Sequence, residues 1–358
     1  MRSYRLPSIL AFVLLGAAAC SDSTAPAPPL NEAGLTAAIS AASATANTQA
    51  SLSLAILGTH INDALTEDGG ALGIAELPAK FLKDPMAVQR TPEQWAHLAT
   101  AGTTPSAIPA AALGKTFAYD TTLHQYVMTE LPGAPANGVR FLLYAVDTVT
   151  AQPILPLEQT GYADLSRTVI AGVATAKVEV YALGEVPMKV LEYSASVSGG
   201  VPRAVVQGFA RNGVDSLTFK LVTTISMLGD AVSLNWRAEV PTQGLVTHVE
   251  EVLKFGNDEL SVAFEGILKS NSGNVLMTGE LDAVDGGQLI VKVNGDLFAR
   301  IAVPGMFEGE PVVTGPTGEP LTVEQALMLR LIFFWYASAF VFFDGLLAPV
   351  DGLLDVAF

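Results

Sequence analysis

Histidine and cysteine, the side chains that most readily bind transition metals, are few in this chain: it has four histidines and one cysteine. The four histidines are widely spaced and form none of the short patterns that bring metal ligands together. They are His60, His97, His124 and His248. We therefore predict no metal site. The sequence also has no phosphate-binding glycine loop and no Gly-x-Ser-x-Gly turn of a serine hydrolase, so we predict no catalytic residue and no cofactor.

Two groups of acidic residues could bind calcium or form a pair of catalytic carboxylates. Asp282, Asp285 and residues 294–296 offer oxygen ligands, but they lack the spacing of a calcium loop and are the residue types that hairpin turns require. The pair Glu250-Glu251 could work with Glu265 in acid–base chemistry. Because the chain is acidic throughout, we expect these carboxylates to be solvated strand residues.

Cys20 is the only cysteine of the chain, and it follows a segment typical of protein export. Residues 1–19 begin with two arginines, continue with an apolar stretch from Leu6 to Leu15 that is too short for a permanent membrane span, and end in small residues. This segment resembles the signal peptide of bacterial lipoproteins. The resemblance implies cleavage before Cys20, attachment of a diacylglycerol to its thiol, and acylation of the new amino group. A plain secretory signal is the alternative.

Residues 20–33 are polar and rich in Pro and Ala, which predicts a flexible tether. Ser21 stands where Asp favours inner-membrane retention in such lipoproteins, so the resemblance implies the outer membrane, facing the periplasm or the cell surface. Cleavage removes two arginines and changes the net charge from -16 to -18, with 17 basic and 35 acidic residues left. That negative charge argues against nucleic acid as a partner. The expected partner is the membrane, which the protein contacts through its lipid anchor.

From about residue 139 to residue 303 the chain reads as a series of antiparallel strands. Over residues 217–227 and 232–240, mostly apolar residues alternate with polar ones, which is typical of strands with one buried face. Asn212-Gly213 and Asn294-Gly295 are hairpin signals between such runs. We expect about eight to ten strands.

Helices are expected on both sides of the strands. Residues 33–65 carry a possible apolar stripe, and Thr91-Pro92-Glu93-Gln94 predicts the start of a short helix. Thr322 and Gln325 form a second capping box, which opens an apolar helix from Val323 to about Phe343 that Asp344-Gly345 would end. We expect this helix to pack on the sheet; membrane insertion, disfavoured by Arg330, and a partner-binding role are the alternatives.

The expected fold class is α+β. A large curved antiparallel sheet or partial barrel would have N-terminal helices at its flank and the apolar C-terminal helix packed on it. The expected regions are a signal peptide (1–19), the lipidated tether (20–33), a mainly helical or irregular region (34–130), the β meander (131–310), and the apolar helix with its tail (311–358).

These features favour a non-catalytic envelope lipoprotein that binds or carries a hydrophobic ligand. Its outline is similar to that of periplasmic lipoprotein carriers and lipid-binding lipoproteins. The alternatives are a structural or interaction scaffold in an envelope complex and, third, an envelope hydrolase. An apolar cavity beneath the C-terminal helix would favour the carrier, whereas a fully packed interior would favour the scaffold.

If Cys20 carries the anchor, Cys20→Ser should move the protein from the membrane fraction to the soluble fraction, because the acyl chains supply the binding energy. Fractionation of cells expressing each form measures this. Unchanged membrane partition of the variant would overturn the lipoprotein interpretation and direct attention to the apolar segment from Leu331 to Phe343.

Overall fold

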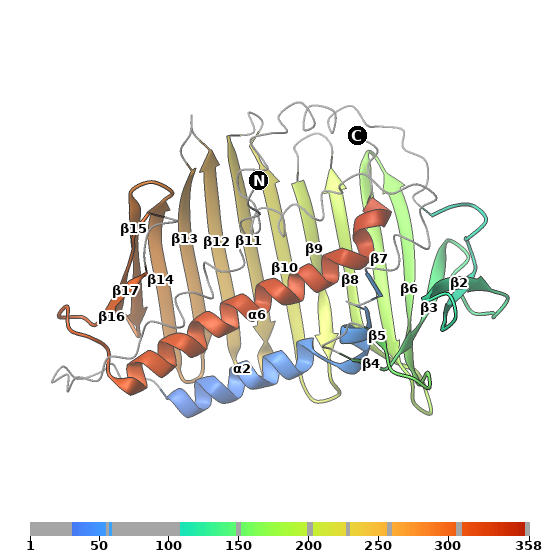
Figure 1. Cartoon of the computed structure of the whole chain (residues 1–358), viewed down its shortest axis with the longest axis horizontal. Coiled ribbons are helices and arrows are strands. Elements are labelled where there is room, and N and C mark those ends of the chain that lie inside the picture. Colours follow the sequence, from blue (N-terminus) through green and yellow to red (C-terminus); the bar gives the residue numbers. More distant parts are fainter. Residues whose placement is uncertain are drawn as a thin grey trace. The chain divides into compact units, whose positions relative to one another are not determined.

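A computed structural model describes residues 31–54, 57–58, 108–147, 152–198, 203–226, 230–255, 260–305 and 310–354. The helices are α2 (Glu32–Ala46), α6 (Val323–Leu354) and the short η3 (Pro241–Gln243); residues 49–54 are also helical. The strands are β1 (Thr116–Asp120), β2 (Gln125–Thr129), β3 (Gly138–Tyr144), β4 (Val146–Asp147), β5 (Gln152–Pro153), β6 (Gln159–Ile170), β7 (Val173–Ala182), β8 (Met188–Ser198), β9 (Arg203–Arg211), β10 (Ser216–Ile225), β11 (Ala231–Val240), β12 (Leu245–Phe255), β13 (Leu260–Ser270), β14 (Gly273–Asp282), β15 (Gly286–Val293), β16 (Asp296–Val303) and β17 (Val312–Thr314) (Figure 1).

Hydrogen bonds order the main strands as β17-β16-β15-β14-β13-β12-β11-β10-β9-β8-β7-β6-β3-β1-β2, an open series of fifteen. The α+β class and the predominantly antiparallel pairing are confirmed, with β1 and β3 as a parallel pair. The expected eight to ten strands were too few. Some turns lack the usual Asn-Gly signal: Ala171 and Gly172, both with positive φ, join β6 to β7. In addition, β1 and β2 lie in the region expected to be helical or irregular.

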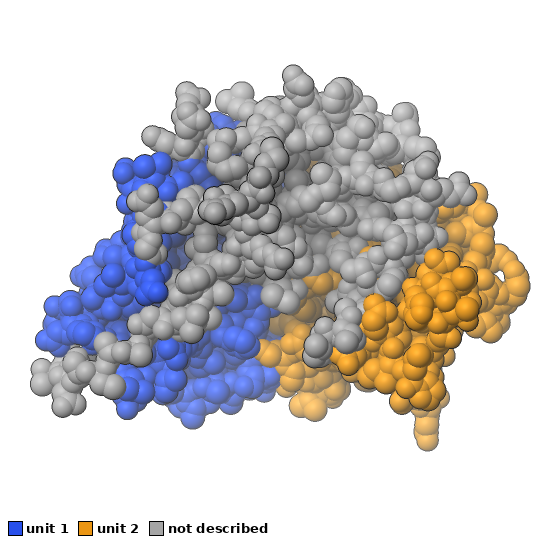
Figure 2. Space-filling model, in the orientation of Figure 1, with its two compact units in different colours: residues 1–42, 79–92, 222–340 blue, residues 43–78, 93–221, 341–358 orange. Residues whose placement is uncertain are grey.

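The chain forms two compact units (Figure 2). Unit 1 consists of residues 1–42, 79–92 and 222–340, and unit 2 of residues 43–78, 93–221 and 341–358. Among the described residues, unit 1 holds β11–β17 with the first parts of α2 and α6. Unit 2 holds β1–β9, most of β10, and the last part of α6.

In unit 1, alternate strand residues face the helices, and we call this side the inner face. Every second residue of β11 from Val232 to Val240 is buried, as its sequence pattern predicts. Trp335 of α6 donates a hydrogen bond from Nε1 to the hydroxyl of Thr247 on β12, at 2.8 Å, and both residues are buried. The apolar side of the strands is therefore covered by direct packing of α6, because a one-sided sheet must bury that side.

Asn31 caps the start of helix α2 and forms hydrogen bonds with both its side chain and its backbone. The Asn31 side-chain oxygen accepts a hydrogen bond from the backbone N–H of Gly34, a typical N-cap contact. The backbone N–H of Asn31 donates to the carbonyl of Ser272 in the β13–β14 turn. The apolar stripe expected here is present within unit 1, since Leu35 and Ile39 are buried.

Helix α6 starts where the sequence predicts, but it ends later than predicted. The capping box is confirmed: Gln325 N–H donates to the Thr322 hydroxyl, and Thr322 N–H donates to the Gln325 side chain. The helix does not stop at Asp344-Gly345 but continues to Leu354 with Pro349 inside it. Tertiary contacts account for the extension, because Leu346 is buried and its carbonyl accepts a hydrogen bond from the hydroxyl of Tyr193.

Unit 2 uses the same alternation. In β10, Leu217, Phe219 and Leu221 are buried as expected, and the ring of Phe219 packs edge-on against Phe342 and Phe343 of α6. In this unit too, the helix packs directly on the apolar side of the strands.

Among the described helices, α6 included, none is long and apolar enough to cross a membrane. The expected signal peptide, Cys20, most of the tether and the helix near Thr91 lie outside the described residues.

The buried Thr247–Trp335 hydrogen bond predicts a measurable loss of stability in Thr247→Val. This isosteric change leaves the indole N–H of Trp335 buried without an acceptor, which should lower the free energy of unfolding by about 1–3 kcal/mol. Urea denaturation measures the difference. Thr218→Val, at an exposed position of β10, is the control and should change stability by less than about 0.5 kcal/mol; equal effects of the two changes would contradict the assignment.

Candidate functional site

The two histidines that the structure describes lie on different strands or turns and in different units. His124 lies in the β1–β2 turn, and His248 lies on β12, where its Nε2 is 3.3 Å from the side-chain oxygen of Asn235. His60 and His97 lie outside the described residues. Within the part of the chain that the structure describes, no three His, Cys, Asp or Glu side chains are grouped in a way that could hold a metal ion.

The residues considered as calcium ligands form hairpin turns. One carboxylate oxygen of Asp282 accepts hydrogen bonds from the backbone N–H groups of Val284 and Asp285, at 2.7 and 3.1 Å. Asn294 and Gly295 adopt positive φ in the β15–β16 turn, as an Asn-Gly hairpin signal predicts. These contacts are the ones that tight turns require.

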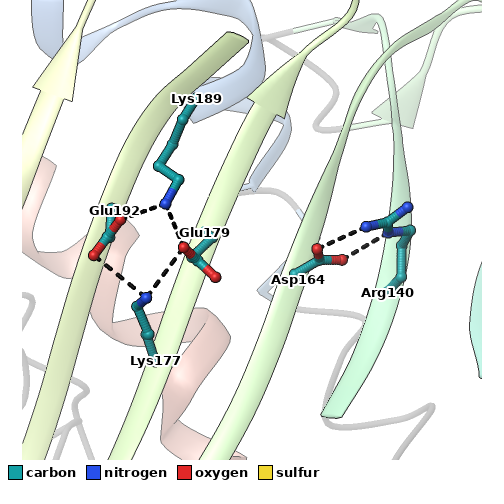
Figure 3. A network of polar contacts seen from close by, with 6 residues as sticks. All are labelled: Arg140, Asp164, Lys177, Glu179, Lys189 and Glu192. Carbon is teal, nitrogen blue, oxygen red and sulfur yellow. Dashed lines mark hydrogen bonds and ion pairs between the residues drawn. The ribbon is translucent and has the colours of Figure 1, made fainter. Parts of the chain in front are cut away.

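Figure 3 shows a group of charged side chains on β3, β6, β7 and β8 of unit 2, which we call the outer-face cluster. Its members are Arg140, Asp164, Lys177, Glu179, Lys189 and Glu192. Arg140 forms two parallel hydrogen bonds to Asp164, each 2.7 Å long, and these bonds raise the pKa of Arg140. The guanidinium also lies 3.8 Å from the ring centre of Tyr162, which stacks on Tyr181.

The remaining four members form a closed set of ion pairs. Lys177 lies 3.1 Å from Glu179 and 3.4 Å from Glu192, and Lys189 contacts the same two carboxylates. Burial opposes ionisation of Glu179, but the hydrogen bonds from Lys189 and Lys177 outweigh it and hold the pKa of Glu179 below its ordinary value. Three cations thus balance three carboxylates. Such paired charges favour the observed pairing of neighbouring strands.

Glu251 differs from Glu250 and Glu265 in its surroundings. Glu250 and Glu265 are exposed and lie opposite each other across β12 and β13, in agreement with the solvated state expected for them. Glu251 instead occupies the inner face, where its partners across the strands are Leu234 on β11 and Phe264 on β13. Solvation was expected for Glu251 as well, whereas its carboxyl is desolvated and the residue is only partly exposed. The signal was present in the sequence, because Glu251 alternates with the apolar residues Val249 and Leu253.

The environment of Glu251 favours the neutral acid. Desolvation of its carboxyl raises the pKa of Glu251 from 4.5 to about 7, and no described residue forms an ion pair or hydrogen bond with it. A buried carboxyl without a partner is costly when it is ionised. Groups with strongly perturbed pKa values cluster at functional sites.

Tyr336 of α6 places a second polar group near this position. Its ring packs against Phe264, the neighbour of Glu251, with centroids 6.1 Å apart, and against Trp236 at 6.3 Å. The Tyr336 hydroxyl is buried, and no described residue hydrogen-bonds to it. It lies over Gly266, where an added Cβ would come within 3.0 Å of the hydroxyl oxygen. Glycine at this position leaves room for the hydroxyl.

Part of the inner face near Glu251 remains accessible. We call Glu251, Val262, Phe264, Gly279 and Leu281 the inner-face patch. All five face the same side as buried neighbours of β12–β14 but are themselves partly exposed; the carboxyl of Glu251 is enclosed closely enough to be desolvated, while part of the residue remains accessible. Phe264 pairs with Gly279, and Val262 pairs with Leu281, so the five residues are contiguous. Chemically, the patch combines an apolar surface with one carboxyl, an arrangement suited to binding an amphipathic molecule.

The raised pKa of Glu251 predicts a stability that falls as pH rises. The folded protein holds its proton up to about pH 7, whereas the unfolded chain releases it near 4.5, so the penalty is absent at low pH and complete above 7. Between about pH 5.5 and pH 8 the wild type should lose up to about 2 kcal/mol relative to Glu251→Gln. Urea denaturation at the two pH values measures this, and the exposed Glu265→Gln serves as the control. A pH-independent difference between wild type and Glu251→Gln would refute the burial of this carboxyl.

Comparison with known proteins gives no further guide to the site. The chain matches no family model, no curated protein and no solved structure. Function is therefore argued from the geometry of the described residues, and the inner-face patch is the candidate functional site.

Proposed function

We propose that this protein is a membrane-anchored envelope lipoprotein that binds a hydrophobic ligand at the inner-face patch and does not catalyse a reaction. The observation that carries the proposal is the partial exposure of Val262, Phe264 and Leu281 on a face that is otherwise buried. Apolar side chains left accessible together are typical of binding surfaces. The anchor is Cys20, and the outer membrane is the proposed location.

The packing of α6 favours a ligand beside the helix over one beneath it. Trp335 and Tyr336 are at most 4% exposed and contact strand residues directly, Trp335 at Thr247 and Tyr336 at Trp236 and Phe264. A cavity beneath the helix was one expectation for a carrier, and the described residues give it no support. The accessible apolar surface of unit 1 instead includes the inner-face patch, where the inner positions of β12–β14 are only partly covered.

An interaction scaffold in an envelope complex is the second candidate, and the outer-face cluster favours it. The stacked pair Tyr162 and Tyr181, with Arg140 above one ring, presents aromatic and charged groups together on one face. Tyr and Arg are enriched in protein interfaces. However, the charges of the cluster are already paired within the chain, so a partner would have to compete with those contacts.

A neutral fluorescent probe tests binding at the patch. N-phenyl-1-naphthylamine brightens in apolar surroundings, and we expect the purified protein to bind it. Leu281→Lys places a charge in the patch and should weaken probe binding at least about tenfold. Val284→Lys is the matched control, because Val284 is 67% exposed in the neighbouring turn, and it should bind like the wild type. Absence of probe binding, or equal binding by the two variants, would argue against a ligand site here; circular dichroism checks that both variants fold.

A further inference from the structure

We infer that the ligand of the inner-face patch carries a positively charged amine at its polar end and that Glu251 is the carboxylate that binds it. This inference rests on the proposed function and narrows it to one class of ligand, namely cationic amphiphiles. Its basis is a carboxyl that has no counter-charge among the described residues and lies at the border of an accessible apolar surface.

The first step concerns the charge of Glu251. Leu234 and Phe264 flank it across the strands, and Val249 and Leu253 precede and follow it on the same face. Buried charges in proteins are as a rule paired or hydrogen-bonded. The described part of the chain supplies no such partner to Glu251, in contrast to the three carboxylates of the outer-face cluster, each of which has a cation. A ligand ammonium group would supply the missing partner.

The second step concerns the aromatic groups beside the carboxyl. Phe264 is the direct cross-strand neighbour of Glu251 and is partly exposed, so its ring is available to a ligand. An ammonium group is attracted to aromatic rings as well as to carboxylates. Behind Phe264, the Tyr336 hydroxyl is a second buried polar group without a described hydrogen-bond partner. A polar ligand end is therefore better accommodated here than at the apolar remainder of the patch.

The third step excludes the opposite charge. A fatty acid or an anionic lipid would place its negative head beside Glu251 and against a chain of net charge -16, or -18 after cleavage. Like charges at such a site repel each other. A neutral alcohol of equal length would gain the apolar contacts without the ion pair, so comparing an amine, an alcohol and an acid separates the contribution of charge from that of the apolar chain.

The experiment measures displacement of N-phenyl-1-naphthylamine at pH 7.5 by decylamine, decanol and decanoate. In the wild type, decylamine should bind at least about tenfold more tightly than decanol, and decanoate should bind most weakly. Glu251→Gln should remove the preference for the amine, so that decylamine and decanol compete equally in this variant. Glu265→Gln, which changes an exposed carboxylate of the neighbouring strand, should keep the preference.

The outcomes separate the two proposals. If decylamine and decanol compete equally in the wild type, or if Glu251→Gln retains the preference, the amine inference is wrong while probe binding still supports a hydrophobic ligand. If neither the probe nor any of the three competitors binds, the proposed function fails, and the inference fails with it. Loss of the amine preference in Glu251→Gln alone supports both.

Discussion

The need to cover an apolar sheet face is the constraint on which the structure of each unit depends. In unit 1 the inner positions of β11 are buried, and α6 packs on them through Trp335 and Tyr336. Burial of apolar surface supplies most of the free energy of folding, at roughly 25 cal/mol for each Å². A helix with apolar residues around most of its circumference suits this task, because its neighbours can cover more than one of its sides.

The same constraint makes the position of Glu251 on the inner face costly. A polar residue on a face selected for burial lowers stability unless something compensates it, and the raised pKa of Glu251 expresses that cost. Natural sequences tend to tolerate such local conflicts where function requires them. Val262 and Phe264 beside it are partly exposed, so Glu251 lies at the border of the packed region.

In unit 2, the side of β7 and β8 away from their buried residues carries charged side chains. There, opposite charges are paired across neighbouring strands. Arg140 pairs with Asp164, and two lysines pair with two glutamates, namely Lys177, Lys189, Glu179 and Glu192. Each pair contributes little by itself in contact with water, but together they favour one strand register over its alternatives. Within unit 2, β7 and β8 therefore bury apolar residues on one side and pair charges on the other.

By itself, the sequence determined the local features of this protein. Alternation over residues 217–225 and 232–240 predicted the buried positions of β10 and β11, and Thr322 with Gln325 predicted the start of α6, because these signals act within a few residues. Only the tertiary structure decided the features that depend on distant segments. Tyr193 and the burial of Leu346 carry α6 past Asp344-Gly345, against the local stop signal. The strand register places Glu251 between Leu234 and Phe264, and neighbours so remote in sequence decide whether a carboxyl lies in water or in an apolar surface.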